Sequence, residues 1–402
     1  MLNFQPNIKS EYRVRWVNHL QDLPKDQWDA MAQPLQTPFF EWTWLHNMEA
    51  SGSVIAEAGW LPNHLTVWQG EQLVGAAPLY LKGHSYGEFT FDHQWAELAE
   101  RLGIRYYPKL LGMSPFTPVE GYRFLIAAAA DAAAITRLMV QAIDDFCDRN
   151  QVSGCNFLYA DPEWQAQMET LGFTAWLHHS YIWQNNGYQS FDDYLAQFNA
   201  NQRRNIKRER KSVTKAGLHF QVHTGAEITP TLCEQVYAFY SDTCDKFGWW
   251  GSKYLTRQFF QQLHPNWRDR TVIFAAYTET DPNPVGLSFC QVKGDQLYGR
   301  YWGAFEDYNH LHFNACYYEP IEWAIKHGIQ RFDPGAGGRH KKRRGFPATP
   351  NTSLHRFYNP TLQQILTDYI SRINASEQAE IEMINEHLPV KKSEVADSEV
   401  AK

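Results

Sequence analysis

Gly328-IQRFDPGAGGRHKKRRG-Phe346 is the stretch from which the organisation of this chain is read. The apolar residues at 329–332 predict a strand that ends at the turn pair Asp333-Pro334. The small residues Gly335, Ala336, Gly337 and Gly338 let a backbone come close to a ligand, and five fixed cations and one histidine follow within six residues. This order is typical of a site for a phosphate, a carboxylate or a developing oxyanion, although a solvated basic turn would have the same composition.

The same order of features occurs twice along the sequence, as helix, Gly, strand, Asp-Pro and then Gly-Phe. The first copy has them at Gly154, Asp161-Pro162 and Gly172-Phe173, and the second at Gly328, Asp333-Pro334 and Gly345-Phe346. A Val-Gly pair lies in a predicted hairpin ahead of each copy. The two Val-Gly pairs are farther apart in the sequence than the other repeated features are, which indicates an insertion at 84–122 in the first copy. Such a long period indicates two tandem α/β modules rather than a solenoid.

The total length supports the same division. A chain of 402 residues is too long for one ordinary core. We therefore predict an α/β (α+β) protein of two tandem domains, each a mixed sheet flanked by helices. The predicted limits are 1–185, 186–372 and a C-terminal helix with a disordered tail at 373–402.

Composition excludes several classes of protein. The net charge of -7 argues against bulk attraction to nucleic acid, so that any such contact must come from local basic patches. The six cysteines contain no C-x-x-C pair, which predicts reduced thiols and no metal site. The N-terminus does not read as a signal peptide, and no apolar run is long enough to span a membrane. We expect a cytoplasmic protein.

The chain between these landmarks gives further expectations. Residues 64–83 predict a β-hairpin around Gly70. The insertion at 84–122 is dense in Pro, Gly and aromatics, which predicts an ordered loop with little regular structure. A helix at 191–215 is expected to begin at Ser190, three strands at 271–305 to form a meander, and a helix to cover 314–327. A polar helix is expected from Asn374 to near Leu388, with the last dozen residues disordered.

The helix at 203–215 is strongly basic. It carries seven lysines and arginines and the single acid Glu209. The charges at 203, 207, 210 and 211 are expected to share one face, with 204, 208 and 215 spread toward the flank. The pattern fits a contact with RNA or anionic lipid, and it fits a solvated helix equally well.

Three strands, a helix and a further strand is the element order of the GNAT acyltransferase fold. The stretch 302–316 lacks the Gln/Arg-x-x-Gly-x-Gly/Ala loop that holds acetyl-CoA in that fold, so binding of acetyl-CoA in the usual mode is not expected. From about residue 13 to 375 the chain resembles the FemAB-like peptidoglycan biosynthesis/recognition family of tandem GNAT-like proteins. The motifs that carry the resemblance are Tyr86-GEFTF-Asp92, Tyr106-YPK-Leu110, Pro115-FTP-Val119 with Gly121, Phe191-DDYL-Ala196, Arg203-Arg204, Arg208-Glu-Arg210, Arg300-YW-Gly303, Leu311-His-Phe313, Cys316-Tyr-Tyr318, Gly335-Ala336, His340-Lys341 and Arg344-Gly-Phe346. Asn314 and Arg339 stand where acidic residues would be expected.

The resemblance implies transfer of an acyl or aminoacyl group to an amine, which needs a base for the amine proton and cations or amides for the oxyanion. The acceptor would be a small-molecule or lipid-linked amine such as an envelope precursor. The co-substrate would be acyl-CoA or aminoacyl-tRNA, with no tightly bound cofactor, and peripheral membrane contact is compatible with this class. The alternative is a non-catalytic protein that recognises an anionic envelope precursor or RNA.

The candidate residues divide into two groups. The candidate catalytic residues are His340, Lys341, His312, Glu88 and Asp92, with His312 or the Glu88/Asp92 pair as the base and His340 and Lys341 for the oxyanion. The candidate anion- and substrate-binding residues are Arg300, Tyr301, Gly335, Gly337, Gly338, Arg343, Arg344, Arg203, Arg204, Lys207 and Arg208. Because the first copy of the repeat lacks both the glycines and the basic run, we expect the chemistry in the second copy.

Overall fold

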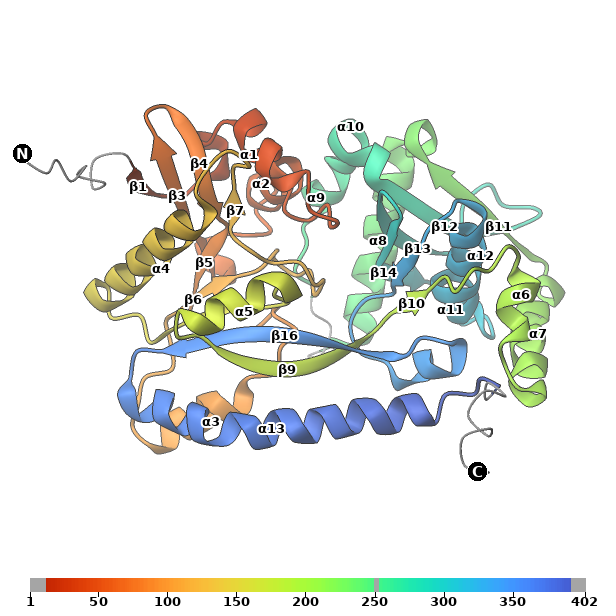
Figure 1. Cartoon of the computed structure of the whole chain (residues 1–402). Coiled ribbons are helices and arrows are strands. Elements are labelled where there is room, and N and C mark those ends of the chain that lie inside the picture. The colour runs from red at the N-terminus through yellow and green to blue at the C-terminus, as the bar shows by residue number, and fades with distance from the viewer. Residues whose placement is uncertain (1–11, 249–252, 392–402) are drawn as a thin grey trace, which may run out of the picture. The chain divides into compact units, whose positions relative to one another are not determined.

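The computed structural model describes residues 12–248 and 253–391, which divide into two compact units (Figure 1). Unit 1 consists of Met1–His178, Ser252–Trp267 and Pro350–Gln378, and unit 2 of His179–Gly251, Arg268–Thr349 and Ala379–Lys402. The domain limits at 185/186 and 372/373 stay predictions. The two units differ from the predicted domains because residues 252–267 and 350–372, which were predicted in the second domain, belong to unit 1. The tail expected to be disordered lies almost wholly outside the described residues.

Two sheets are built mainly from the first half of the chain. The smaller has the strand order β1-β3-β4-β7 and consists of β1 (Arg13–Val17), β3 (His64–Gln69), β4 (Gln72–Ala77) and β7 (Leu125–Ile126). The larger has the order β2-β5-β6-β8-β16-β9 and consists of β2 (Trp60–Pro62), β5 (Leu79–Lys82), β6 (Lys109–Gly112), β8 (Gly154–Phe157), β16 (Ala348–Phe357) and β9 (Thr174–Tyr181). Strands β6 and β8 are parallel, so the larger sheet is mixed.

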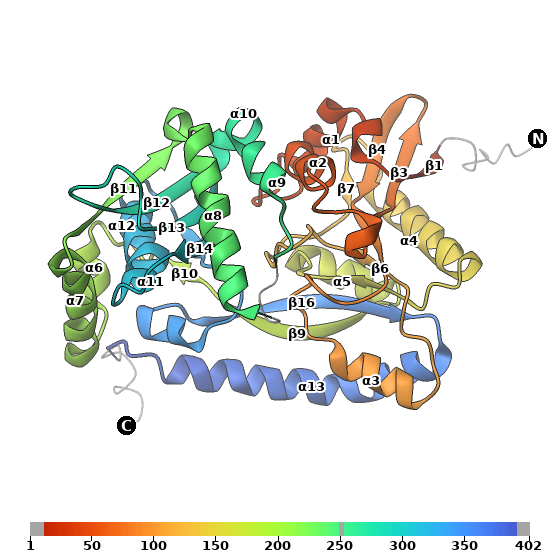
Figure 2. The same ribbon diagram turned by 180° about the vertical axis from the view of Figure 1, so that it is seen from behind.

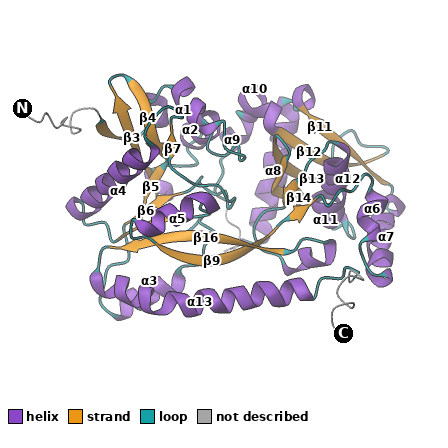
Figure 3. Cartoon of the chain, in the orientation of Figure 1, coloured by secondary structure: helices purple, strands orange, loops and turns teal. Residues whose placement is uncertain are grey.

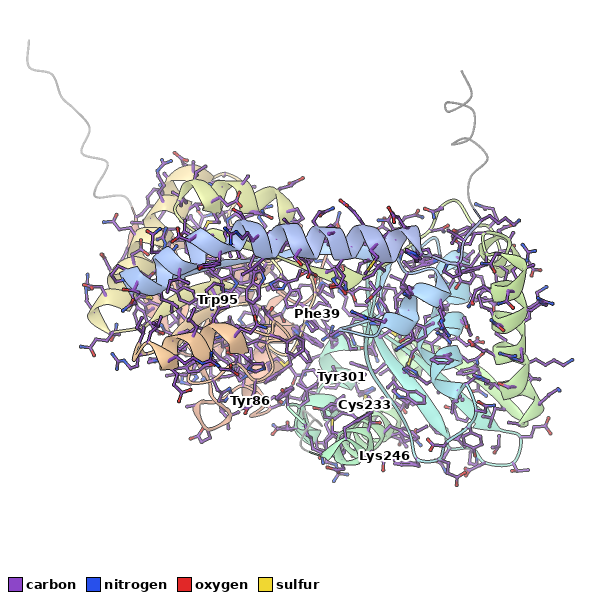
Figure 4. The ribbon with its side chains drawn as sticks, turned by 90° about the horizontal axis from the view of Figure 1, so that it is seen from below. Phe39, Tyr86, Trp95, Cys233, Lys246 and Tyr301 are labelled. Carbon is purple, nitrogen blue, oxygen red and sulfur yellow. The ribbon has the colours of Figure 1, made fainter. Side chains whose placement is uncertain are left out.

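Helices pack around these sheets. In unit 1 they are α1 (Lys25–Ala32), α2 (Trp42–Ala50), α3 (His93–Arg101), α4 (Ala132–Arg149), α5 (Pro162–Thr170), α9 (Arg257–Gln261) and α10 (Leu263–Trp267). Helix α13 (Pro360–Glu386) begins 14 residues before the polar helix that the sequence predicts. Its first turns bury Leu362, Leu366 and Ile370 against Trp95 of α3, and Figure 4 shows Trp95 beside α13.

Two expectations for unit 1 are wrong in detail. The region 84–122 contains helix α3 and strand β6, and β6 lies inside the larger sheet between β5 and β8. Its Gly and Pro residues lie outside these two elements, except for Gly112 at the end of β6. The second strand of the predicted hairpin is also divided at Pro78, and β4 and β5 join different sheets. Proline has no N–H to continue a ladder, which explains why the chain changes sheets there.

Unit 2 contains one six-stranded sheet flanked by helices (Figure 3). Its order is β10-β15-β14-β13-β12-β11, with β10 (Trp183–Gln184), β15 (Arg331–Asp333), β14 (Gln296–Ala304), β13 (Gly286–Lys293), β12 (Thr271–Thr278) and β11 (Leu218–Thr224). Its helices are α6 (Phe191–Ala196), α7 (Ala200–Lys215), α8 (Pro230–Lys246), α11 (Leu311–Phe313), the π-helical turn η7 (Asn314–Tyr318), α12 (Glu319–Lys326) and the 3₁₀ helix η8 (Arg339–Arg344). Strands β11 to β14 are the predicted meander with one further strand.

The helix predicted at 191–215 is two helices, α6 and α7. As expected, the Ser190 side chain caps the first by accepting a hydrogen bond from the Asp193 N–H. The second has its own cap, because the Asn199 side chain accepts from the Gln202 N–H. The sequence Gln-Phe-Asn at 197–199 therefore ends one helix and begins another.

The arrangement of β13, β14 and β15 determines where unit 2 is hollow. Strands β14 and β15 are parallel and pair only from Gln296 to Tyr298. Beyond that point β14 continues along β13, with a register shift at Phe289/Cys290, while the chain after β15 turns away at Pro334. Two parallel strands that part at their carboxyl ends leave a crevice, which is where ligands bind in open α/β sheets.

Candidate active site in unit 2

A cavity of about 220 Å³ occupies this crevice between the carboxyl ends of β14 and β15. Its walls come from β13, β14, the α11–η7 helix and the loop that follows β15. The lining residues are Ser288, Cys290, Gly299, Arg300, Tyr301, Trp302, His312, Cys316, Tyr317, Pro334, Ala336, Gly337, Gly338, His340 and Lys341. Seven of the candidate site residues therefore share one cavity in the second copy of the repeat.

The glycines of the loop have a geometric reason. Gly335 has a φ of 90°, and a Cβ there would lie 3.0 Å from the carbonyl oxygen of Gly299 on β14. Gly338 also has a φ of 90° where η8 begins. Both conformations favour glycine, and together they allow the loop to pass close to β14 and then start a helix at the cavity.

Lys341 is the buried cation of the cavity. Its Nζ donates to the carbonyl oxygens of Gly335 at 2.6 Å and Ala336 at 3.2 Å. Burial lowers the pKa of Lys341 to about 8, against the opposing charges of Asp333 and Cys316. A lysine ammonium has three donors, so one N–H is left over from these two contacts with the described residues. At neutral pH the cavity thus holds a positive charge with a donor to spare.

A histidine and a tyrosine form a polar pair in the same cavity. His340 Nε2 and the Tyr317 hydroxyl share a hydrogen bond of 2.8 Å. Burial, together with the charges of Arg344 and Lys341, lowers the pKa of His340. Burial and the neighbouring His340 likewise lower the pKa of His312 to about 4. Both imidazoles are therefore neutral at pH 7 and able to accept a proton.

Arg344 of η8 is not part of the cavity lining, but its contacts hold the helices that form the cavity. It is buried, and its guanidinium donates to Glu209 at 2.8 Å and to the carbonyl oxygen of His340 at 3.0 Å. It also lies 3.4 Å from the ring centre of Phe313. Glu209 accepts a further hydrogen bond from Tyr318 of η7. The single acid of α7 thus holds η7 and η8 together.

Replacing Arg344 by methionine is expected to destabilise the protein by about 2–3 kcal/mol, because it leaves the partly buried Glu209 with one partner fewer. The midpoint of urea unfolding measures this change. Adding Glu209→Gln to the same chain should recover part of the loss, since the uncompensated charge is gone. An unchanged midpoint in the single variant would show that the pair contributes nothing to stability.

The remaining candidates in unit 2 lie outside the cavity lining. Arg343 is exposed on the outer side of η8, and Arg204, Lys207 and Arg208 are exposed on α7. Arg203 is half-buried and donates to the carbonyl oxygen of Phe198. Their roles as anion-binding residues stay predictions, and the structure separates them from the cavity wall.

Glu88 and Asp92 lie in unit 1, where both are buried against Lys109. The Nζ of Lys109 is 2.7 Å from a Glu88 oxygen and 2.5 Å from an Asp92 oxygen. Burial raises the pKa of Glu88 to about 7. Burial would also raise the pKa of Asp92, but the charge and hydrogen bond of Lys109 hold it below its ordinary value. Their role as the base of the reaction stays a prediction.

Several residues of the cavity were not among the candidates. Tyr317, Cys316, Ser288 and Cys290 line it, and Asp333 is buried next to it with a hydrogen bond from the Gly335 N–H. Cys316 and Tyr317 stand in one of the family motifs, which was the available signal. No pattern in the sequence pointed to Ser288 or Cys290, which lie on the central strand β13.

The sequence profile of the FemAB-like family, described as peptidoglycan biosynthesis/recognition, matches residues 19–392. The chain belongs to the FemAB-like family. No curated protein matches the sequence of this FemAB-like chain. In the described residues, no helix is both long and apolar enough to cross a membrane.

Solved structures resemble the FemAB-like chain over most of its length. FemX is 10% identical with a TM-score of 0.50, covering 88% of this chain and 99% of FemX. L-PGS from Bacillus licheniformis is 9% identical with a TM-score of 0.51, covering 88% and 97%. A tandem GNAT protein from the clavulanic acid biosynthesis pathway is 12% identical with a TM-score of 0.45, covering 87% and 99%. At such identities the likeness concerns the fold alone.

Proposed function

We propose that the cavity of unit 2 transfers an acyl or aminoacyl group to an amine of a cell-envelope precursor. The observation that carries this proposal is the pairing, in one cavity, of a buried lysine cation with a neutral His340–Tyr317 pair. Acyl transfer to an amine needs both a positive charge for the oxyanion and a neutral base for the amine proton. Membership of the FemAB-like family supports the same class of reaction.

The proposed reaction follows from these groups. The amine nitrogen attacks the carbonyl carbon of an activated acyl ester or thioester, a C–N bond forms, and the carbonyl electron pair moves to oxygen. The free N–H of Lys341 stabilises that oxyanion. The amine proton passes through the Tyr317 hydroxyl to His340. When the bond to the leaving group breaks, the same proton protonates the leaving oxygen or sulfur, and an amide remains.

The start of the α11 helix bears on the choice of donor. In the usual GNAT mode, free amides at this helix N-terminus would hold the pyrophosphate of CoA. Here the Leu311 N–H donates to the Tyr308 carbonyl oxygen, and Ser212 of α7 donates to the Asn309 carbonyl oxygen and contacts His310. Helix α7 therefore covers the start of α11. This supports an aminoacyl-tRNA over an acyl-CoA as the donor.

A transfer assay tests the proposal. The purified protein is incubated with labelled aminoacyl-tRNAs or acyl-CoAs and with soluble or lipid-linked envelope precursors, and the acceptors are analysed by mass spectrometry. We expect one acceptor to gain the mass of the acyl group. Tight binding of a precursor with no mass gain from any donor would favour a recognition protein that has kept the fold.

A further inference from the structure

Helix α7 presents a row of cations on its exposed side. Figures 1 and 2 show α7 beside α6, on the outer side of unit 2. At about 100° per residue, the exposed cations of α7 fall within one face roughly 100° wide and about 16 Å long. These residues, here called the basic face, are Arg204, Lys207, Arg208, Lys211 and Lys215.

The charged side chains of α7 are sorted between its two sides. Arg210, on the inner flank, pairs with Glu319 at 3.1 Å and Glu322 at 2.6 Å. Glu209 is turned toward Arg344, as described above. None of the five cations of the basic face forms an ion pair with another described residue. Arg203 and Arg210 lie on the flank beside Lys207, as the sequence predicts, and both are used within unit 2.

Helix η8 packs against the side of α7 that faces away from the basic face. The Gln202 side chain of α7 donates to the Arg343 carbonyl oxygen at 2.6 Å, which fixes the start of α7 to η8. Arg343 is exposed, whereas His340 and Lys341 of the same short helix line the cavity. One side of η8 thus belongs to the cavity, and Arg343 is an exposed cation of unit 2 outside the basic face.

The shape of the basic face indicates its partner. Its side chains are all long and flexible and leave one straight helix in one direction, so a flat anionic surface can meet all of them at once. The exposed large apolar side chains of the described residues lie on neither α7 nor η8. The face therefore has no aromatic platform for stacking the bases of single-stranded RNA, which is how such RNA is usually gripped.

We propose that the basic face of α7 docks unit 2 onto the anionic surface of a lipid bilayer. The contact is electrostatic and reversible, because no apolar side chain of α7 accompanies the cations. The docking itself does not depend on the proposed function, since it requires only the surface charges.

Vesicle co-sedimentation of the full chain tests the docking. At low salt we expect binding to mixed phosphatidylcholine and phosphatidylglycerol vesicles at least about tenfold stronger than to phosphatidylcholine alone, and loss of the difference in raised salt. The variant Lys207→Glu, Arg208→Glu, Lys211→Glu should lose this binding. A neutral variant with Gln at the same three positions should lose most of the vesicle binding. It checks that the loss in the Glu variant does not come from misfolding.

A matched control changes the same number of exposed arginines in unit 1, as Arg101→Glu, Arg137→Glu and Arg149→Glu. It should bind anionic vesicles like the wild type. Equal loss in the control, or no preference of the wild type for anionic vesicles, would overturn the proposal. So would binding of a duplex RNA that only the α7 variants lose, together with no vesicle binding. The transfer assay with a soluble acceptor is independent, so docking and transfer can fail separately.

Discussion

Replacing Lys341 by methionine is expected to lower the rate of acyl transfer about 100- to 1,000-fold, as the loss of one oxyanion donor does elsewhere. The change removes the buried cation of the cavity and keeps a side chain of similar length. The variant also loses the hydrogen bonds of Lys341 to the carbonyl oxygens of Gly335 and Ala336, so its stability is measured as well. The measurement is kcat/KM with the donor and acceptor found in the transfer assay, beside the unfolding midpoint.

Lys341→Arg separates charge from other roles of this residue. The wild-type cation is lost as the pH rises through about 8, so transfer should decline above that pH. Arginine stays protonated at any working pH, and the alkaline decline should disappear in this variant even if its rate is lower. A persistent decline near pH 8, or full activity of Lys341→Met, would remove Lys341 from the mechanism.

The sequence predicts one local feature of the site, a backbone at the small residues 335–338 that can approach a neighbour closely. The left-handed conformations of Gly335 and Gly338 are properties of single residues, and the cations that follow are adjacent in the chain. The hydrogen bond between Tyr317 and His340 could not be predicted, because these residues are 23 positions apart and meet only through the π-helical turn η7. The position of Glu209 could be predicted only in part. A lone acid in a basic helix suggests an inward position, but not that its partner is Arg344.

Long-range pairing explains the largest departure from the expected organisation. A repeat in the sequence suggests two consecutive modules, each closing its own sheet. Strand β16 instead pairs with β8 far earlier in the chain, with Leu354 opposite Phe157. Local pattern contains no information about which of two similar sheets a late strand will join. The same limit applies to β6. From the sequence, Lys109 is expected in a loop, and only the pairing of β6 with its neighbours shows that this lysine is buried in a sheet.

That lysine gives the second large effect. Replacing Lys109 by methionine is expected to destabilise the protein by about 3–5 kcal/mol, because Glu88 and Asp92 would remain buried without their shared cation. Burial lowers the pKa of a lysine, yet the two carboxylates raise the pKa of Lys109 above its ordinary value, so the charge is part of the fold. Urea unfolding followed by tryptophan fluorescence measures the loss as a lower midpoint of the least stable transition.

Lys82 is the matched control, since it lies directly opposite Lys109 on the neighbouring strand and is equally buried. Burial lowers the pKa of Lys82 to about 7. The unfolded chain therefore binds more protons at this group between about pH 7 and its ordinary pKa, and its contribution to stability rises with pH over that window. Lys82→Met should cost much less than Lys109→Met at pH 7 and should remove that rise. Adding Glu88→Gln and Asp92→Asn to Lys109→Met should restore part of its stability. If both lysine variants lose the same amount and the triple variant recovers nothing, the loss comes from packing of the aliphatic stems, and charge pairing is not what holds this side of the sheet.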